Sequence, residues 1–140
     1  MNKAIAAIII ALVSLPAWGK VVRGYSTQSA GATAAVVDSI DFRQDLTRVY
    51  ARLKGTPHTA ARIDNITMQA GKTTLVMNDI DGIDAERWFQ WEDTPYIPIE
   101  IDFAPIKNTG TKMVFSISGP HGISSWVATP KTSLNQKKRK

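Results

Sequence analysis

Residues 97–103 read IPIEIDF, and this short run decides the fold that we predict for the chain. Its apolar residues occupy every second position, with the carboxylates Glu100 and Asp102 between them. A period of two is typical of a β-strand that has one face in the core and one face in water. The run therefore predicts an antiparallel sheet with a dry side and a wet side.

The same alternation continues outward from this run in both directions. Residues 112–118 and 45–53 repeat it clearly, and residues 35–42, 61–68, 73–77, 87–92 and 123–129 do so more weakly. Turn-forming residues separate these segments at roughly the 8–12-residue spacing of β-sandwiches and barrels. We therefore expect an all-β domain, an immunoglobulin-like β-sandwich of about seven or eight short antiparallel strands. A short helix near residues 84–88 is the one alternative, because Asp84 suits a helix N-cap.

The first 19 residues have the pattern of a secretory signal peptide. Lys3 provides a positive start, residues 4–15 are continuously apolar, and small residues flank the expected cleavage site near Gly19. The apolar run is shorter than the roughly 18 residues that a membrane span requires, so we expect export without a membrane-spanning anchor. The chain has no cysteine, which excludes disulfides and thiolate sites. We expect a periplasmic or secreted protein.

Composition divides the rest of the chain into three parts. Residues 20–33 are rich in small residues and predict a flexible lead-in, residues 34–130 form the domain, and residues 131–140 form a basic, disordered tail. The chain has 17 Lys and Arg residues against 12 Asp and Glu, but four of the 17 are residues 137–140. The body is therefore close to neutral and has no basic stripe, so nucleic-acid binding is not expected.

Charges are segregated along the body. Residues 78–102 contain eight of the 12 acidic residues and only Arg87 as a base, whereas residues 45–62 contain four bases and only Asp45 as an acid. Such segregation can be internal, with an acidic and a basic strand side by side forming cross-strand pairs. It can also attract a basic protein partner to the acidic side.

Within the acidic region, residues 79–82 (DIDG) suggest a calcium loop. An EF-hand needs oxygen ligands at positions 1, 3 and 5, glycine at 6 and glutamate at 12. With Gly82 at position 6, Met77 falls at position 1 and Trp88 at position 12, and starting at Asp79 fails as well. This excludes an EF-hand. A different calcium site, formed by Asp79, Asp81 and Asp84, and a simple acidic turn both stay open.

Candidate catalytic residues lack the spacing that catalysis requires. His58 and His121 both follow a proline in a turn, with no zinc motif around either, and no serine lies in a G-x-S-x-G context. Glu100 and Asp102 share a strand face, as exposed carboxylates often do. We predict no catalytic residue, metal or cofactor. His121 is the better binding candidate, because flanking glycines let a partner approach the backbone.

Large aromatic residues follow the acidic turn. In a strand, Phe89 and Trp91 share one face and Trp88 takes the other, so Trp88 either is exposed beside Glu92 or packs under the turn. We predict a protein-interaction module, such as an inhibitor, an immunity-type protein or an envelope-assembly accessory protein. Its predicted binding residues are Asp81, Asp84, Trp88, Glu92, His121 and Trp126. The alternative is a carbohydrate or cell-wall binding module that stacks sugars on Trp88 and Trp126, and the third is a metal-dependent or carboxylate-based hydrolase.

Overall fold

The computed structural model describes residues 20–108 and 110–131 as an antiparallel β-structure of twelve strands. The predicted signal peptide, and all but the first residue of the predicted basic tail, lie outside the described residues. No helix in the described chain has the length and hydropathy needed to cross a membrane. The strands are β1 (Lys20–Arg23), β2 (Tyr25–Ala30), β3 (Ala34–Phe42), β4 (Thr47–Lys54), β5 (Ala60–Arg62), β6 (Asn65–Ala70), β7 (Thr73–Val76), β8 (Asp79–Asp81), β9 (Trp88–Gln90), β10 (Tyr96–Phe103), β11 (Met113–Gly119) and β12 (Gly122–Pro130).

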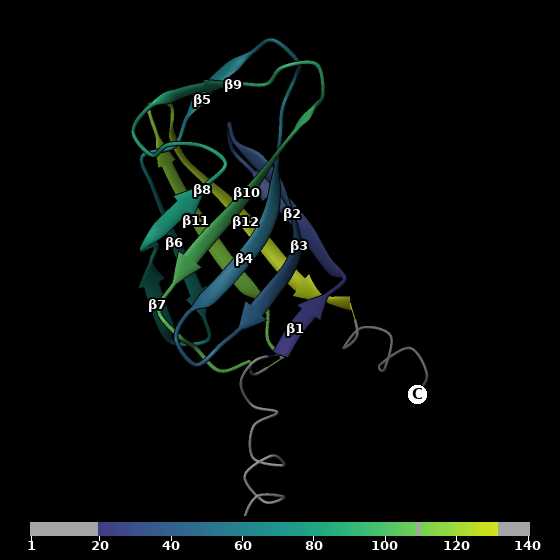
Figure 1. The fold of residues 1–140 in the computed structure, drawn as a ribbon, viewed down its shortest axis with the longest axis vertical. Helices are drawn as coiled ribbons and strands as arrows, with labels where there is room; N and C mark the ends of the chain where they lie inside the picture. Colours follow the sequence, from purple (N-terminus) through teal and green to yellow (C-terminus); the bar gives the residue numbers. More distant parts are fainter. Residues whose placement is uncertain (1–19, 109, 132–140) are drawn as a thin grey trace, which may run out of the picture.

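Two five-stranded sheets pack face to face, and their strands cross in projection (Figure 1). The first sheet has the order β1-β3-β4-β10-β8, and the second has the order β2-β12-β11-β6-β7. The short strands β5 and β9 form a separate two-stranded ribbon at one end of the molecule (Figure 1). This end carries the candidate site described below.

The core lies between the two large sheets. Ile99, Ile101 and Phe103 of β10 are buried, so the alternation predicted for residues 97–103 is confirmed. The ring of Phe103 lies 6.2 Å from that of Phe115 in the opposite sheet, and Phe115 lies 5.9 Å from Trp126. Apolar side chains from both sheets thus meet in one layer, which provides the main stabilisation of a domain without disulfides.

The predicted all-β class is confirmed, but the strand count is wrong: the described chain has twelve strands in three sheets, not seven or eight. The immunoglobulin-like arrangement is therefore not confirmed. One reason is that residues 61–68 do not form one strand. Ile63 and Asp64 separate β5 from β6, which belong to different sheets.

The predicted flexible lead-in is also wrong, because residues 20–30 form β1 and β2. Gly24, with a φ of 78°, lets the chain pass from one sheet to the other. Two side chains of β2 bond to the backbone of β3 through their hydroxyls: Thr27 Oγ1 accepts a hydrogen bond from the N–H of Val37, and Ser29 Oγ bonds to the backbone of Ala35. These contacts replace the apolar residues that a pattern search needs.

The helix considered near residues 84–88 does not form. Glu86 has a φ of 64°, a left-handed value that an α-helix cannot include. Its backbone N–H donates to the carbonyl of Ile63, 2.8 Å away, which ties the turn to the segment between β5 and β6. The chain therefore turns after β8 and enters β9 at Trp88.

Candidate functional site

The segregated charges lie next to each other on the outer face of the first sheet. Arg48 on β4 lies opposite Asp102 on β10, with nitrogen–oxygen distances of 2.8 and 2.9 Å. This side-chain hydrogen bond raises the pKa of Arg48 above its already high ordinary value. Arg52 forms a similar pair with Asp38 on β3, at 2.9 Å. The internal pairing expected between the basic and acidic strands is confirmed for Arg48 and Asp102.

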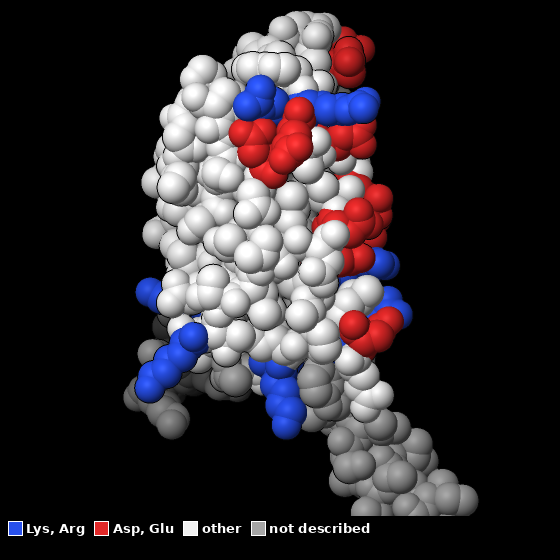
Figure 2. Space-filling model, turned by 90° about the vertical axis from the view of Figure 1, so that its left-hand side faces the viewer, with Lys and Arg blue, Asp and Glu red and all other residues white. Residues whose placement is uncertain are grey.

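Pairing does not neutralise the acidic side. Asp81 and Asp79 on β8 lie directly opposite Glu100 and Asp102 on β10. Like charges opposite each other in a sheet are destabilising, and Arg48 is the base that contacts this group. In the described chain, neither Asp79 nor Asp81 forms an ion pair. Figure 2 shows carboxylates gathered along one side of the molecule, beside a wide uncharged face.

No three His, Asp or Glu side chains within residues 20–108 and 110–131 come together as a metal site. Asp79 and Asp81 lie two residues apart on a strand, about 7 Å by backbone geometry, and Asp84 follows in the next turn. The carboxylates of the acidic run are therefore spread along an edge instead of converging on one point. The turn after β8 requires glycine at residue 82, because a Cβ there would lie 2.3 Å from the carbonyl oxygen of Pro98.

The ribbon of β5 and β9 places Trp88 on its outer face, where 57 % of the residue is exposed. Trp88 lies opposite Arg62, and the guanidinium carbon of Arg62 lies 5.7 Å from the centre of the indole ring. Asp64 holds this guanidinium with hydrogen bonds of 2.8 and 3.2 Å. The result is an exposed aromatic ring supported by a fixed cation.

The opposite face of β9 turns inward, as the alternation predicted. Phe89 and Trp91 meet edge to face with ring centres 5.4 Å apart, and Trp91 is buried. The indole N–H of Trp91 donates to the carbonyl of Leu53 at 3.0 Å, which fixes the ring beneath the ribbon. Trp88 is therefore the exposed member of this aromatic group.

Trp126 does not provide a second exposed ring, so this part of the prediction is wrong. It is 0 % exposed, because β12 turns residues 124, 126 and 128 toward the core. Its indole N–H donates to the carbonyl of Thr33 at 2.9 Å. Trp126 is a core residue.

The other predicted binding residues lie in different places. Asp81 and Asp84 line a shallow hollow beside β8, and Glu92 is exposed in the loop after β9. His121 lines a cavity at the end of the molecule, whose described lining contains no Asp or Glu. Glu100 lines a separate hollow on the first sheet. Glu92, Glu100 and His121 thus do not meet in one cavity, which is what the hydrolase alternative required.

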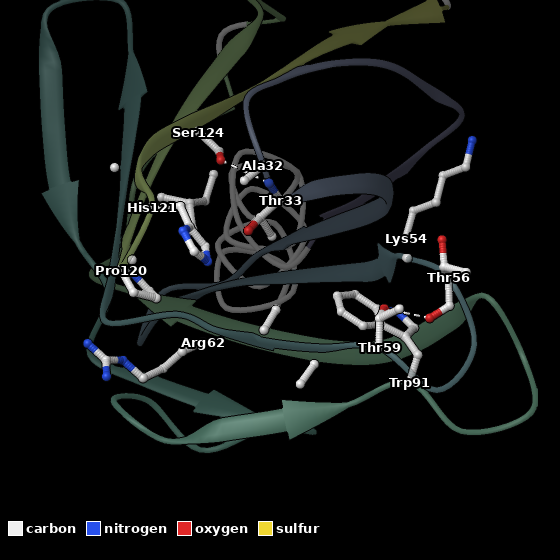
Figure 3. A pocket seen from close by; sticks show the side chains of 16 residues that line it. Ala32, Thr33, Lys54, Thr56, Thr59, Arg62, Trp91, Pro120, His121 and Ser124 are labelled. Atoms are coloured by element: carbon white, nitrogen blue, oxygen red, sulfur yellow. Dashed lines mark hydrogen bonds between the residues drawn. The ribbon is translucent and has the colours of Figure 1, made fainter.

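The end cavity has a volume of about 240 Å³ and lies beside the ribbon. Its lining comes from the β2–β3 turn, the end of β4 with the β4–β5 loop, β5, the residue after β9 and the β11–β12 hairpin. Figure 3 shows the imidazole of His121 directed into the space between these segments, while the side chains of Lys54 and Arg62 extend away from it. The floor includes the ring of Trp91.

Three glycines let these segments approach closely. A Cβ on Gly55 would lie 2.4 Å from the ring of Trp91, and a Cβ on Gly119 would lie 2.6 Å from the carbonyl oxygen of Arg62. A Cβ on Gly31 would lie 2.7 Å from Ser124 Oγ. The shape of the cavity therefore depends on missing side chains.

Sequence reasoning identified His121 but missed Lys54, Arg62 and Ser124 as its neighbours. Lys54 and Arg62 are far from His121 in the chain. Ser124 is only three residues away, but nothing in the sequence shows that both line one cavity, and the only local signals were the glycines at residues 31, 55 and 119. No known protein family, curated protein or solved structure matches the chain.

Proposed function

We propose that the protein is an exported binding protein that recognises another protein through Trp88 and Arg62. The observation that carries the proposal is the exposed indole of Trp88 resting on a guanidinium that Asp64 holds in place. Trp and Arg are the residue types most enriched among interface residues that dominate binding energy. A ring that is already held in place loses little conformational freedom when a partner covers it.

The neighbouring acidic surface gives the partner its expected charge. Asp79, Asp81 and Asp84 precede β9 in the chain and Glu92 follows it. None of the four forms an ion pair in the described chain. A surface of uncompensated carboxylates attracts a basic protein and speeds its association. Inhibitors, immunity-type proteins and accessory factors of envelope assembly act by contacts of this kind, and the signal-like first 19 residues would deliver such a protein to the periplasm or the exterior.

The second candidate is a carbohydrate or cell-wall binding module. It is favoured by the free face of Trp88, which lies beside polar side chains and could stack on a sugar ring. It is weakened by the burial of Trp91 and Trp126, which leaves one exposed tryptophan in the described chain instead of a row.

Affinity capture with matched variants separates these functions. Mature protein, its Trp88→Ala variant and an Ile123→Ala control are each used to capture proteins from an envelope extract. Ile123 is a suitable control because it is a large apolar residue, 74 % exposed, on a different sheet. We expect a discrete partner that wild type and the control bind equally and that Trp88→Ala binds about 30-fold more weakly.

Equal binding by all three proteins would contradict the proposal. A glycan or peptidoglycan titration that quenches tryptophan fluorescence in wild type but not in Trp88→Ala, with no protein captured, would establish the carbohydrate function instead.

A further inference from the structure

We propose that the end cavity binds an oxyanion, the carboxylate or phosphate group of a ligand, through His121, Ser124 and Lys54. Arg62 borders both this cavity and the proposed protein contact, but it is not one of the three residues that bind the oxyanion, so this inference does not depend on that contact. It rests on the chemistry of the lining, on the turn that positions His121 at the cavity and on the free proton of a buried hydroxyl.

The lining has donors and no carboxylate. It contains the basic residues Lys54, Arg62 and His121 together with several Ser and Thr hydroxyls, and no Asp or Glu. The hollows on the acidic side are each lined by at least one Asp. An anion in the end cavity therefore meets no like charge on the wall, whereas it would be repelled from the other hollows.

The three basic residues have different roles. Arg62 is engaged by Asp64, so its charge is largely compensated. Lys54 forms no ion pair within the described chain, and its flexible four-carbon stem lies on the cavity rim. Although its ammonium extends outward in Figure 3, rotation about that stem can bring the charge over the cavity mouth. Lys54 supplies the permanent positive charge.

His121 is held by a rigid turn. Gly119 pairs with Gly122, so Pro120 and His121 form the two-residue loop of the β11–β12 hairpin. Pro120 has a fixed φ, and Gly122 adopts a φ of 106° that other residues rarely take. The close approach of Gly119 to the backbone of Arg62 fixes the hairpin tip against β5. The turn therefore fixes the backbone at His121, and its imidazole is directed into the cavity in the structure.

Ser124 provides a directed hydroxyl. It is 4 % exposed, and its Oγ accepts a hydrogen bond from the N–H of Thr33 at 3.0 Å (Figure 3). A hydroxyl has one proton to donate in addition to its lone pairs, and no described acceptor takes the proton of Ser124. An oxyanion is the partner that accepts hydrogen bonds from this hydroxyl and the imidazole together, and that attracts the ammonium.

The test uses the mature protein and two small probes at constant ionic strength. Sodium phosphate and N-acetyl-dialanine with a free carboxylate are titrated while the ring-proton NMR signals of the two histidines are followed. Sodium chloride and the amide-capped dipeptide are the controls. We expect a saturable shift of the His121 signal with one or both oxyanions and no saturable shift of the His58 signal. The two probes distinguish a phosphate site from a carboxylate site.

Matched substitutions complete the test. In His121→Asn, which lacks the reporting ring, binding is followed by the backbone amide signals of the cavity residues, and we expect no saturable shift. His58→Asn should leave binding unchanged, because His58 lies outside the cavity and Asn tolerates its φ of 67°. Lys54→Gln should weaken binding about 10-fold. Trp88→Ala should bind both probes normally, so that failure here and failure of the proposed protein contact stay distinguishable. Equal shifts of both histidines, or unchanged affinity in His121→Asn with an intact amide spectrum, would overturn the proposal.

Discussion

Gly55→Ala is the substitution whose effect follows most directly from the structure. Gly55 has an ordinary backbone conformation, so alanine introduces no backbone strain. Its new Cβ, however, would lie 2.4 to 2.6 Å from three atoms of the Trp91 ring. The ring cannot easily move away, because it is buried against Phe89 and its N–H is bonded to the carbonyl of Leu53. Either the ring or the β4–β5 loop has to shift.

Two effects of opposite sign determine the magnitude. Overpacking of a filled site costs about 1–3 kcal/mol. Replacing glycine by alanine restricts the unfolded chain, which stabilises the folded state by about 0.4–1 kcal/mol. The clash is the larger effect, and we expect a net loss of about 1–2 kcal/mol. In urea this corresponds to a midpoint lower by roughly 0.5–1 M, which equilibrium denaturation measures directly.

A double-mutant cycle tests the stated cause. In a Trp91→Phe background the smaller ring leaves room for the alanine, so Gly55→Ala should cost at least about 1 kcal/mol less than in wild type. An unchanged midpoint in Gly55→Ala alone would refute the reasoning. The same loss with and without the tryptophan would show that the alanine acts somewhere else.

Three further outcomes follow from the charged and buried groups. Arg48→Gln should lower stability by about 2 kcal/mol in denaturant titrations, because it leaves the partly buried Asp102 among three other carboxylates. Asp81→Asn should raise stability by about 0.5 kcal/mol at low salt and by less at high salt, because it removes the like charge opposite Glu100. Burial raises the pKa of Tyr25 from 10.0 to about 12, so above pH 10 the unfolded state loses this proton first. Stability should therefore fall between pH 10 and about 12, and Tyr25→Phe should reduce that fall by about 1–2 kcal/mol.

Sequence analysis predicted the strands whose buried face consists of apolar side chains. In β10 and β11, Ile and Phe side chains occupy the inward positions, and the period of two is therefore visible. β2 lacks this signal because Thr27 and Ser29 use their hydroxyls to bond to the backbone of β3. β8 lacks it because it is only three residues long and has an Asp at either end. Tertiary pairing, and not local preference, makes these segments strands.

Sequence predicted the candidate site only where the alternation of side chains along a strand decides which face each residue occupies. The opposite faces of Trp88 and Trp91 follow from their spacing of three residues in an extended segment. The same rule places Trp126 and Ala128 on one face of β12. Alternation alone does not show whether that face lies inward, so the burial of Trp126 could not be predicted from it. The end cavity joins residues from 32 to 124, and a single sequence has no signal for such distances.

The opposed carboxylates of β8 and β10 have two explanations that differ in what they require. β8 is the edge strand of its sheet, and charges on an edge prevent pairing with another chain. That role needs the charge of Asp79 and Asp81 on the edge itself, but it gives no reason for Glu100 opposite. Attraction of a basic partner depends on the summed charge, so it accounts for all of these carboxylates together. Glu100 also lies 3.9 Å from Arg48, so pairing within the sheet is a further reason for its charge. Under the proposed function the summed charge predicts that Asp81→Asn and Glu100→Gln slow association with a basic partner equally, although only Asp81 lies on the edge; a slower rate in Asp81→Asn alone would contradict it.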